Sequence, residues 1–256
     1  MKKTLLALAT ASALIVSGSA LAAFADATQG EGSGANAQIK IAGTLTNTNP
    51  NWMWQIPAAA QGSVTDVALK RITGVAVGDN TEFAISKTEM SILEGYMSTP
   101  SPTGVAGITP VITIGGKDMA EVDCSMIAGG CSVEISATNG GATAGKIIAH
   151  LEASAAAAFI GGTNGDSYIT GAEVGDGSRE ALEVLRTQGS FNESYPGVQA
   201  TIGLTYRGME ALLSNVNSKK ISNSRVVMLA SSKLVVPTDA IPDTWAATLP
   251  MTISLK

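Results

Sequence analysis

The single histidine of the chain, His150, lies among side chains that could do hydrolytic chemistry. A serine hydrolase needs a nucleophile and a general base, so a catalytic triad in this chain would have to use His150 as the base. Glu152 and Ser154 follow at steps of two residues, which places the three side chains on one face of a strand. The sequence shows no donors beside them for an oxyanion. We therefore interpret His150 as a half-exposed strand residue and expect no catalytic role for it.

Three acids, Asp166, Glu173 and Asp176, lie in the glycine-rich stretch TNGDSYITGAEVGDG. A pair of carboxylates is the machinery of a glycosidase. A calcium-binding loop needs acids at closer spacing than these. We interpret the three acids as solvated loop residues. The sequence thus predicts a protein that is not an enzyme and that has no catalytic residue, no metal ligand and no cofactor.

The two cysteines, Cys124 and Cys131, are separated by six residues. This spacing differs from the reactive C-x-x-C pattern, and one histidine is too few for a zinc site. In an oxidising compartment the two cysteines are expected to pair. The sequence therefore predicts a disulfide that closes a short hairpin around Ala128-Gly129-Gly130 and contributes roughly 2 kcal/mol to stability.

The N-terminal residues have the features of a secretory signal peptide. Lys2 and Lys3 precede an apolar run and then small residues, and we place the signal peptide at residues 1–22, with cleavage after Ala25 as the alternative. No later stretch reaches about 18 uninterrupted apolar residues, so an exported, soluble chain is expected. Removal of residues 1–22 takes away two lysines and no acid, so the net charge of −5 becomes −7. That charge argues against a nucleic-acid partner.

Strand patterns occupy most of the remaining chain. Apolar and polar residues alternate in four clear segments, at residues 38–45, 147–154, 198–207 and 249–255. Short strands separated by Gly, Asn, Ser and Pro predict an all-β sandwich or barrel. Trp52 and Trp54 lie two residues apart, so we expect both rings on one side of a strand, in the core or against the inserted segment. A sugar-stacking platform is the alternative for this pair.

Two segments have a helical pattern. Residues 178–188 predict a helix with Ser178 as its N-cap and Gly189 as its stop. A second short helix is expected over residues 208–215. We interpret residues 155–197 as an insertion carried on the sandwich.

A glycine-rich, polar segment at residues 23–36 precedes the first predicted strand and reads as a flexible arm. Phe24 is its only prominent large apolar residue. Sheet edges that are left unpaired invite another chain to add a strand, with backbone pairing for affinity and alternate side chains for specificity.

The segments QIKIAGTLTNTNPNWMWQI (residues 38–56) and TWAATLPMTISLK (residues 244–256) resemble the first and last strands of the FaeG-like subunits of chaperone–usher fimbriae. The resemblance implies an immunoglobulin-like sandwich over residues 38–256 that lacks its last strand. A donor arm, residues 23–37 of a neighbouring subunit, would complete it. The apolar residues of the closing strand would line part of the acceptor groove: Leu249, Met251, Ile253 and Leu255.

The resemblance also implies a function and partners. The expected protein is a structural and adhesive subunit of a bacterial surface fimbria that attaches to host cells. Its partners would be a periplasmic chaperone, an outer-membrane usher, neighbouring subunits and a host glycoconjugate. The chain departs from the family at Leu255, where an aromatic is usual, and in its cysteine pair, which leaves major and minor subunits both open. The alternatives are a secreted, non-polymerising carbohydrate-binding sandwich and an exported glycoside hydrolase.

Overall fold

The computed structural model describes residues 52–64, 67–86, 89–120, 124, 129–161, 166–171, 176–188, 195, 199–200 and 206–256. The signal peptide, the arm and the strand predicted at residues 38–45 lie outside these residues.

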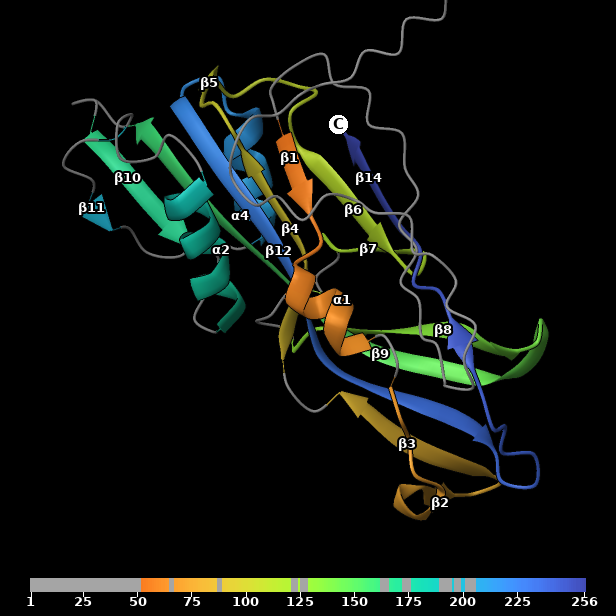
Figure 1. Ribbon diagram of the computed structural model, residues 1–256. Helices are drawn as coiled ribbons and strands as arrows, with labels where there is room; N and C mark the ends of the chain where they lie inside the picture. Colours follow the sequence, from red (N-terminus) through yellow and green to blue (C-terminus); the bar gives the residue numbers. More distant parts are fainter. Residues whose placement is uncertain are drawn as a thin grey trace, which may run out of the picture.

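Two long antiparallel strands, β9 (Ala142–Gly161) and β12 (Lys219–Pro237), form the scaffold of the molecule (Figure 1). They belong to an 11-stranded sheet whose main path runs β1-β4-β12-β9-β10-β11. The other strands on this path are β1 (Trp52–Gln55), β4 (Met90–Met97), β10 (Asp166–Gly171) and β11 (Gln199–Ala200). Branching from it are β2 (Val75–Val77), β3 (Asn80–Ser86), β5 (Ser101–Thr103), β8 (Cys131–Asn139) and β13 (Ala246–Ala247).

A second, smaller sheet has three strands in the order β14-β6-β7. They are β6 (Pro110–Ile114), β7 (Lys117–Asp118) and β14 (Met251–Leu255). The helical elements are α1 (Ala58–Val64), the 3-10 turn η1 (Arg71–Thr73), α2 (Asp176–Gln188) and α4 (Tyr206–Ser214). The predicted all-β fold with a small helical segment is thereby confirmed.

Strand β12 is buried on both faces from Ile221 to Leu229, and its apolar run Val226–Leu229 is typical of such a strand. Ile221, Val227 and Leu229 face one cluster of buried side chains, which we call the main core. Val226 and Met228 face the opposite side and pack with α2. The main core joins the two sheets and includes Trp52, Ile92, Ile112, Leu151, Met209, Leu213, Leu249 and Met251.

A run of alanines on β9 lets α2 approach the sheet closely. Ala156 and Ala158 are fully buried against Ala181 and Leu185 of the helix, and the Ser224 hydroxyl of β12 donates a 2.6 Å hydrogen bond to the carbonyl of Ala181. Small side chains at these positions are what a helix lying flat on a sheet requires. The helix predicted at residues 178–188 is confirmed, but it begins at Asp176, so Ser178 lies in its first turn and is not its N-cap.

The strand predicted at residues 198–207 is wrong at its C-terminal end. Of the described residues in this segment, Gln199 and Ala200 form β11, whereas Tyr206 already belongs to α4. Tyr206, Met209 and Leu213 lie on one helical face and are buried in the main core. Burial of that face outweighs the period-two pattern of the preceding residues, because helical stability in proteins comes mainly from packing an amphipathic face.

Gly95 of β4 gives a test of how β1 packs. The indole of Trp54 occupies the space above Gly95, and a Cβ atom there would come within 2.1 Å of the ring. We expect Gly95→Ala to lower the free energy of unfolding by about 1–3 kcal/mol, as overpacking does. Urea denaturation measures the loss. In a Trp54→Leu background the same substitution should cost clearly less, and an equal cost in both backgrounds would contradict this packing.

Candidate functional site

Strand β14 is paired along one edge, and the opposite edge, which we call the outer edge, faces no described strand. The backbone N–H of Lys256 bonds the Thr109 carbonyl at 2.9 Å, and the Thr109 N–H bonds the Lys256 carbonyl at 3.2 Å. Backbone direction alternates along an antiparallel strand. The N–H and C=O groups of Met251, Ile253 and Leu255 therefore point to the outer edge. Figure 1 shows β14 beside β6, close to the C-terminus.

The four apolar side chains predicted to line an acceptor groove all pack on the main core. Leu249 and Met251 are buried in it. Ile253 and Leu255 are only half-buried, although they contact the same cluster. Thr252 and Ser254, between them, are exposed. The alternation predicted from the sequence is thus present, and the apolar face of β14 becomes less covered toward the C-terminus.

The proline in β6 fits this pairing. Pro110 lies opposite Leu255, at a position where the antiparallel ladder needs no N–H from β6. Strand β7 pairs only with Thr113 and Ile114 of β6, so it needs none from Pro110 either. Pro110 therefore sits where a sheet tolerates proline.

Strand β1 pairs with β4 only, among the described strands. The Trp52 indole N–H donates to the Ile108 carbonyl at 2.9 Å, which ties β1 to the segment before β6. The rings of Trp52 and Trp54 stack with centroids 5.2 Å apart and an interplanar angle of 16°. Both pack in or on the main core, so the expected core role of the tryptophan pair is confirmed.

A buried positive charge lies on the main-core face of β12. Arg225 is 0 % exposed, and its guanidinium carbon lies 4.3 Å from the centroid of the Tyr206 ring. Burial raises the pKa of the Tyr206 hydroxyl, and the charge of Arg225 opposes that rise. Sequence reasoning missed this residue, because a polar stretch such as SNSR normally indicates a solvated strand end. The apolar run Val226–Leu229 follows Arg225 directly and could have indicated that this part of the strand is buried.

Helix α4 is connected to the end of β14. The Lys256 ammonium lies 3.3 Å from the Glu210 carboxylate of the helix. The backbone N–H of Val105 also bonds the Leu213 carbonyl, at 2.9 Å. The helix therefore lies at the end of the β14–β6 pair where β14 ends and β6 begins.

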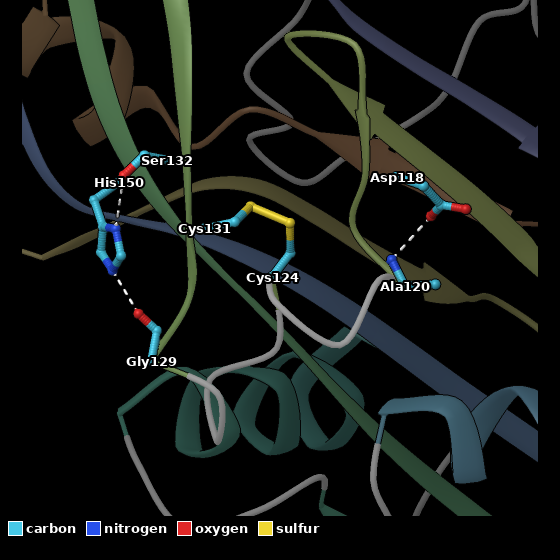
Figure 2. Close-up of a disulfide and its surroundings, with 7 residues drawn as sticks. All are labelled: Asp118, Ala120, Cys124, Gly129, Cys131, Ser132 and His150. Atoms are coloured by element: carbon cyan, nitrogen blue, oxygen red, sulfur yellow. Dashed lines mark hydrogen bonds between the residues drawn. A yellow bond between two sulfur atoms is a disulfide. The ribbon is translucent and has the colours of Figure 1, made fainter.

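The predicted disulfide between Cys124 and Cys131 is present and joins the loop before β8 to that strand (Figure 2). Beside it, His150 is half-buried, as expected, and its Nε2 lies 2.6 Å from the Gly129 carbonyl. With the proton on Nε2, the ring donates to Gly129, and Nδ1 accepts from the Ser132 hydroxyl at 3.3 Å. The imidazole thus connects Gly129 to β8 and β9 next to the disulfide.

The remaining candidate residues lie on different elements or outside the described residues. Asp166 begins β10 and Asp176 begins α2, whereas Glu173 lies outside the described residues. Ser154 is buried on the α2 side, and burial raises the pKa of Glu152. Within the described ranges, no group of three or more His, Cys, Asp or Glu could hold a metal ion. No helix in those ranges is long and apolar enough to cross a membrane.

The sequence model of a family described as fimbrial major and minor subunits matches residues 1–189. The chain belongs to this family. The expected FaeG-like resemblance is confirmed, and the protein is a structural subunit of a cell-surface fimbria that associates with other fimbrial subunits. This is a family of structural subunits rather than of enzymes. A search of curated proteins gave no match.

The disulfide gives a prediction for the stability of this fimbrial subunit. Replacing both cysteines with serine should lower the free energy of unfolding by about 2 kcal/mol, because the unfolded chain regains the freedom of a short loop. Urea denaturation under oxidising conditions measures the change. Reductant should destabilise the natural chain and leave the double variant unaffected. A natural chain that is indifferent to reductant would contradict a structural role for the bond.

Proposed function

We propose that this subunit polymerises by donor-strand exchange, in which the outer edge of β14 receives residues 23–37 of a neighbouring subunit. The observation that carries the proposal is the state of β14. Its backbone groups at Ile253 and Leu255 face no described strand, while the side chains of the same residues are only half-covered by the core. A donated strand would satisfy the backbone groups and cover the side chains at once.

A periplasmic chaperone occupies the same edge before assembly, and an outer-membrane usher exchanges the chaperone for the next subunit. A chaperone is needed because the uncovered edge of β14 is prone to aggregation. A strand with an unpaired backbone and apolar side chains is a template for aggregation, and proteins normally cover such edges. Export through residues 1–22 would bring the chain to the compartment where such a chaperone acts.

We further propose that the subunit attaches to host cells through a glycoconjugate, with the segment around β10 and α2 as the candidate receptor-binding surface. Figure 1 places β10 and α2 on the opposite side of the molecule from β14. A receptor bound there would leave the outer edge of β14 accessible to the neighbouring subunit.

The test of polymerisation is a thermal melt of residues 38–256 with and without a peptide of residues 23–40. The peptide should raise the melting temperature and make it depend on peptide concentration, because a ligand that binds only the folded state stabilises it by mass action. A stable monomer that is indifferent to the peptide would contradict donor-strand exchange. That outcome would favour a secreted carbohydrate-binding sandwich that does not polymerise.

A matched pair of variants locates the binding edge. Ile253→Asp places a charge on the half-buried face of β14, whereas Thr252→Asp places the same charge on its exposed face. We expect Ile253→Asp to weaken peptide binding about tenfold or more, because the carboxylate would lose hydration under the donated strand. Thr252→Asp should bind nearly as the natural chain does. Equal losses from both variants would mean that the peptide docks elsewhere.

A further inference from the structure

Most of the exposed large apolar side chains in the described part of the chain gather in two groups. The first consists of Ile72, which is 91 % exposed, with Val75 and Val77, and we call it the β2 patch. The second consists of Val105 and Val216, the latter 67 % exposed, and we call it the turn patch. Single exposed apolar residues are ordinary on a protein surface, whereas a group of them marks a contact surface.

The two patches lie at the two ends of strand β12. At its start, Lys219 pairs with Thr103 of β5, beside the turn patch. At its end, Pro237 pairs with Asn80 of β3, and β3 pairs with β2. The strand has 19 residues and therefore extends over roughly 60 Å of chain. Figure 1 shows β5 and β2 at opposite ends of the molecule.

Tertiary contacts hold the β2 patch in place. The Arg71 guanidinium donates to the Asp243 carboxylate at 2.8 Å, which connects η1 to the segment after β12. Gly74, between η1 and β2, lies so close to the Phe83 ring of β3 that a Cβ atom there would come within 2.7 Å of it. The other edge of β2 faces no described strand. The patch is thus supported from one side and open to a partner on the other.

Close contacts also fix the turn patch, between α4 and β12. The Thr103 hydroxyl donates to the Val216 carbonyl at 2.7 Å. A Cβ atom on Gly104 would come within 2.4 Å of the backbone of Asn215, so the end of β5 packs tightly on the turn. A surface whose backbone is already fixed loses little conformational entropy when a partner binds. Both patches are therefore suited to a defined contact.

The charges beside the two patches differ in sign. Lys219 and Lys220 are exposed beside the turn patch and form no ion pair with a described residue. Asp79 and Asp239 are exposed beside the β2 patch, where the residue before Asp239 donates its backbone N–H to the Asp79 carbonyl at 3.0 Å. Lys70, before η1, offsets part of this negative charge. Opposite charges on two surfaces steer their association and disfavour wrong partners.

The arrangement of the two patches identifies the partner. The chain belongs to a family of subunits that associate with one another in a fimbria. A filament of like subunits grows through heterologous contacts, in which one surface of a subunit meets a different surface of the next. Two apolar patches at opposite ends, with opposite charges beside them, fit this geometry. A two-fold dimer would instead place each patch against itself and bring like charges together.

We propose that the β2 patch of one subunit packs on the turn patch of a neighbouring copy of this chain, as a head-to-tail contact along the fimbria. The apolar side chains cover one another at the centre of the contact, and the two aspartates face the two lysines at its rim. The contact is small, so it acts together with the donated strand that already links two subunits. It is separate from the outer edge of β14 and uses none of its residues.

Cysteine cross-linking in fimbriae of the mature chain, residues 23–256, tests the contact. The two natural cysteines are bonded to each other, so new cysteines have no natural thiol to pair with. Fimbriae that carry Val77→Cys and Val216→Cys in every subunit should give, after mild oxidation and denaturation, a ladder of covalent multimers on a non-reducing gel. Either substitution alone should leave the subunits monomeric. The matched control joins Val77→Cys to Arg186→Cys, an exposed position on α2, and should give no ladder.

Charge reversal in the same double-cysteine chain tests the rim. We expect Asp79→Lys to slow the cross-linking about fivefold or more, because it brings like charges together across the contact. Adding Lys220→Asp should restore most of the rate. Lys220 has a left-handed backbone with φ 48°, which aspartate tolerates. Adding Arg186→Asp instead should restore nothing, and equal recovery from both would contradict the pairing of the charges.

The outcomes separate this contact from the proposed strand exchange. Fimbriae that form but give no ladder overturn the contact and leave donor-strand exchange standing. Dimers from Val77→Cys alone would reveal a two-fold contact and overturn the head-to-tail arrangement, as would a ladder from the Arg186→Cys control. If the first cysteine pair prevents assembly, Val75→Cys with Val105→Cys applies the same test. A failure of strand exchange would be seen instead in the peptide melt, which this contact does not affect.

Discussion

The organisation of this subunit depends on the need of every β-strand to satisfy its backbone on both edges. Strand β14 pairs with β6 through an antiparallel ladder that extends to Lys256 and Thr109. On the outer edge the same strand presents backbone groups that no described strand pairs. A buried, unpaired amide or carbonyl costs free energy comparable to a lost hydrogen bond, so such an edge is stable only when water or another strand covers it. In the proposed mechanism, a strand donated by a neighbouring subunit meets that requirement.

The same constraint shapes the interior. Strand β12 lies between β4 and β9 and has both faces buried, one under α2 and one in the main core. Polar residues on such a strand need hydrogen-bond partners from the elements that pack on its two faces. Ser224 finds one in the Ala181 carbonyl of α2, at 2.6 Å. Arg225, on the other face, places its guanidinium carbon 4.3 Å from the centroid of the Tyr206 ring.

The sequence predicted those features that a local pattern controls. Alternation in residues 249–255 predicted the inward face of β14, and the i, i+2 spacing of Trp52 and Trp54 predicted their shared side. The spacing of Cys124 and Cys131 predicted their bond, which is present. Each of these depends on residues that are close in sequence, where periodicity and loop length suffice.

Features that depend on distant contacts were not predictable. The period-two pattern ending at Tyr206 indicated a strand, but the packing of α4 on the main core made that residue helical. The burial of Arg225 depends on its neighbours in β4 and β9, which lie about 70–130 residues away in the chain. The length of β9 and β12 was also missed, because register shifts such as the one between Leu229 and Ser231 interrupt their alternation without ending the strands.

The most direct test of the account is residue-resolved hydrogen exchange at β14, with and without the arm. In residues 38–256 alone, the amides of Thr252 and Ser254, which bond β6, should be protected, whereas those of Ile253 and Leu255 should exchange rapidly. Adding the peptide of residues 23–40 should protect Ile253 and Leu255 and leave the other two nearly unchanged. Protection of all four amides without the peptide, or rapid exchange of Ile253 and Leu255 in its presence, would contradict an acceptor edge at β14.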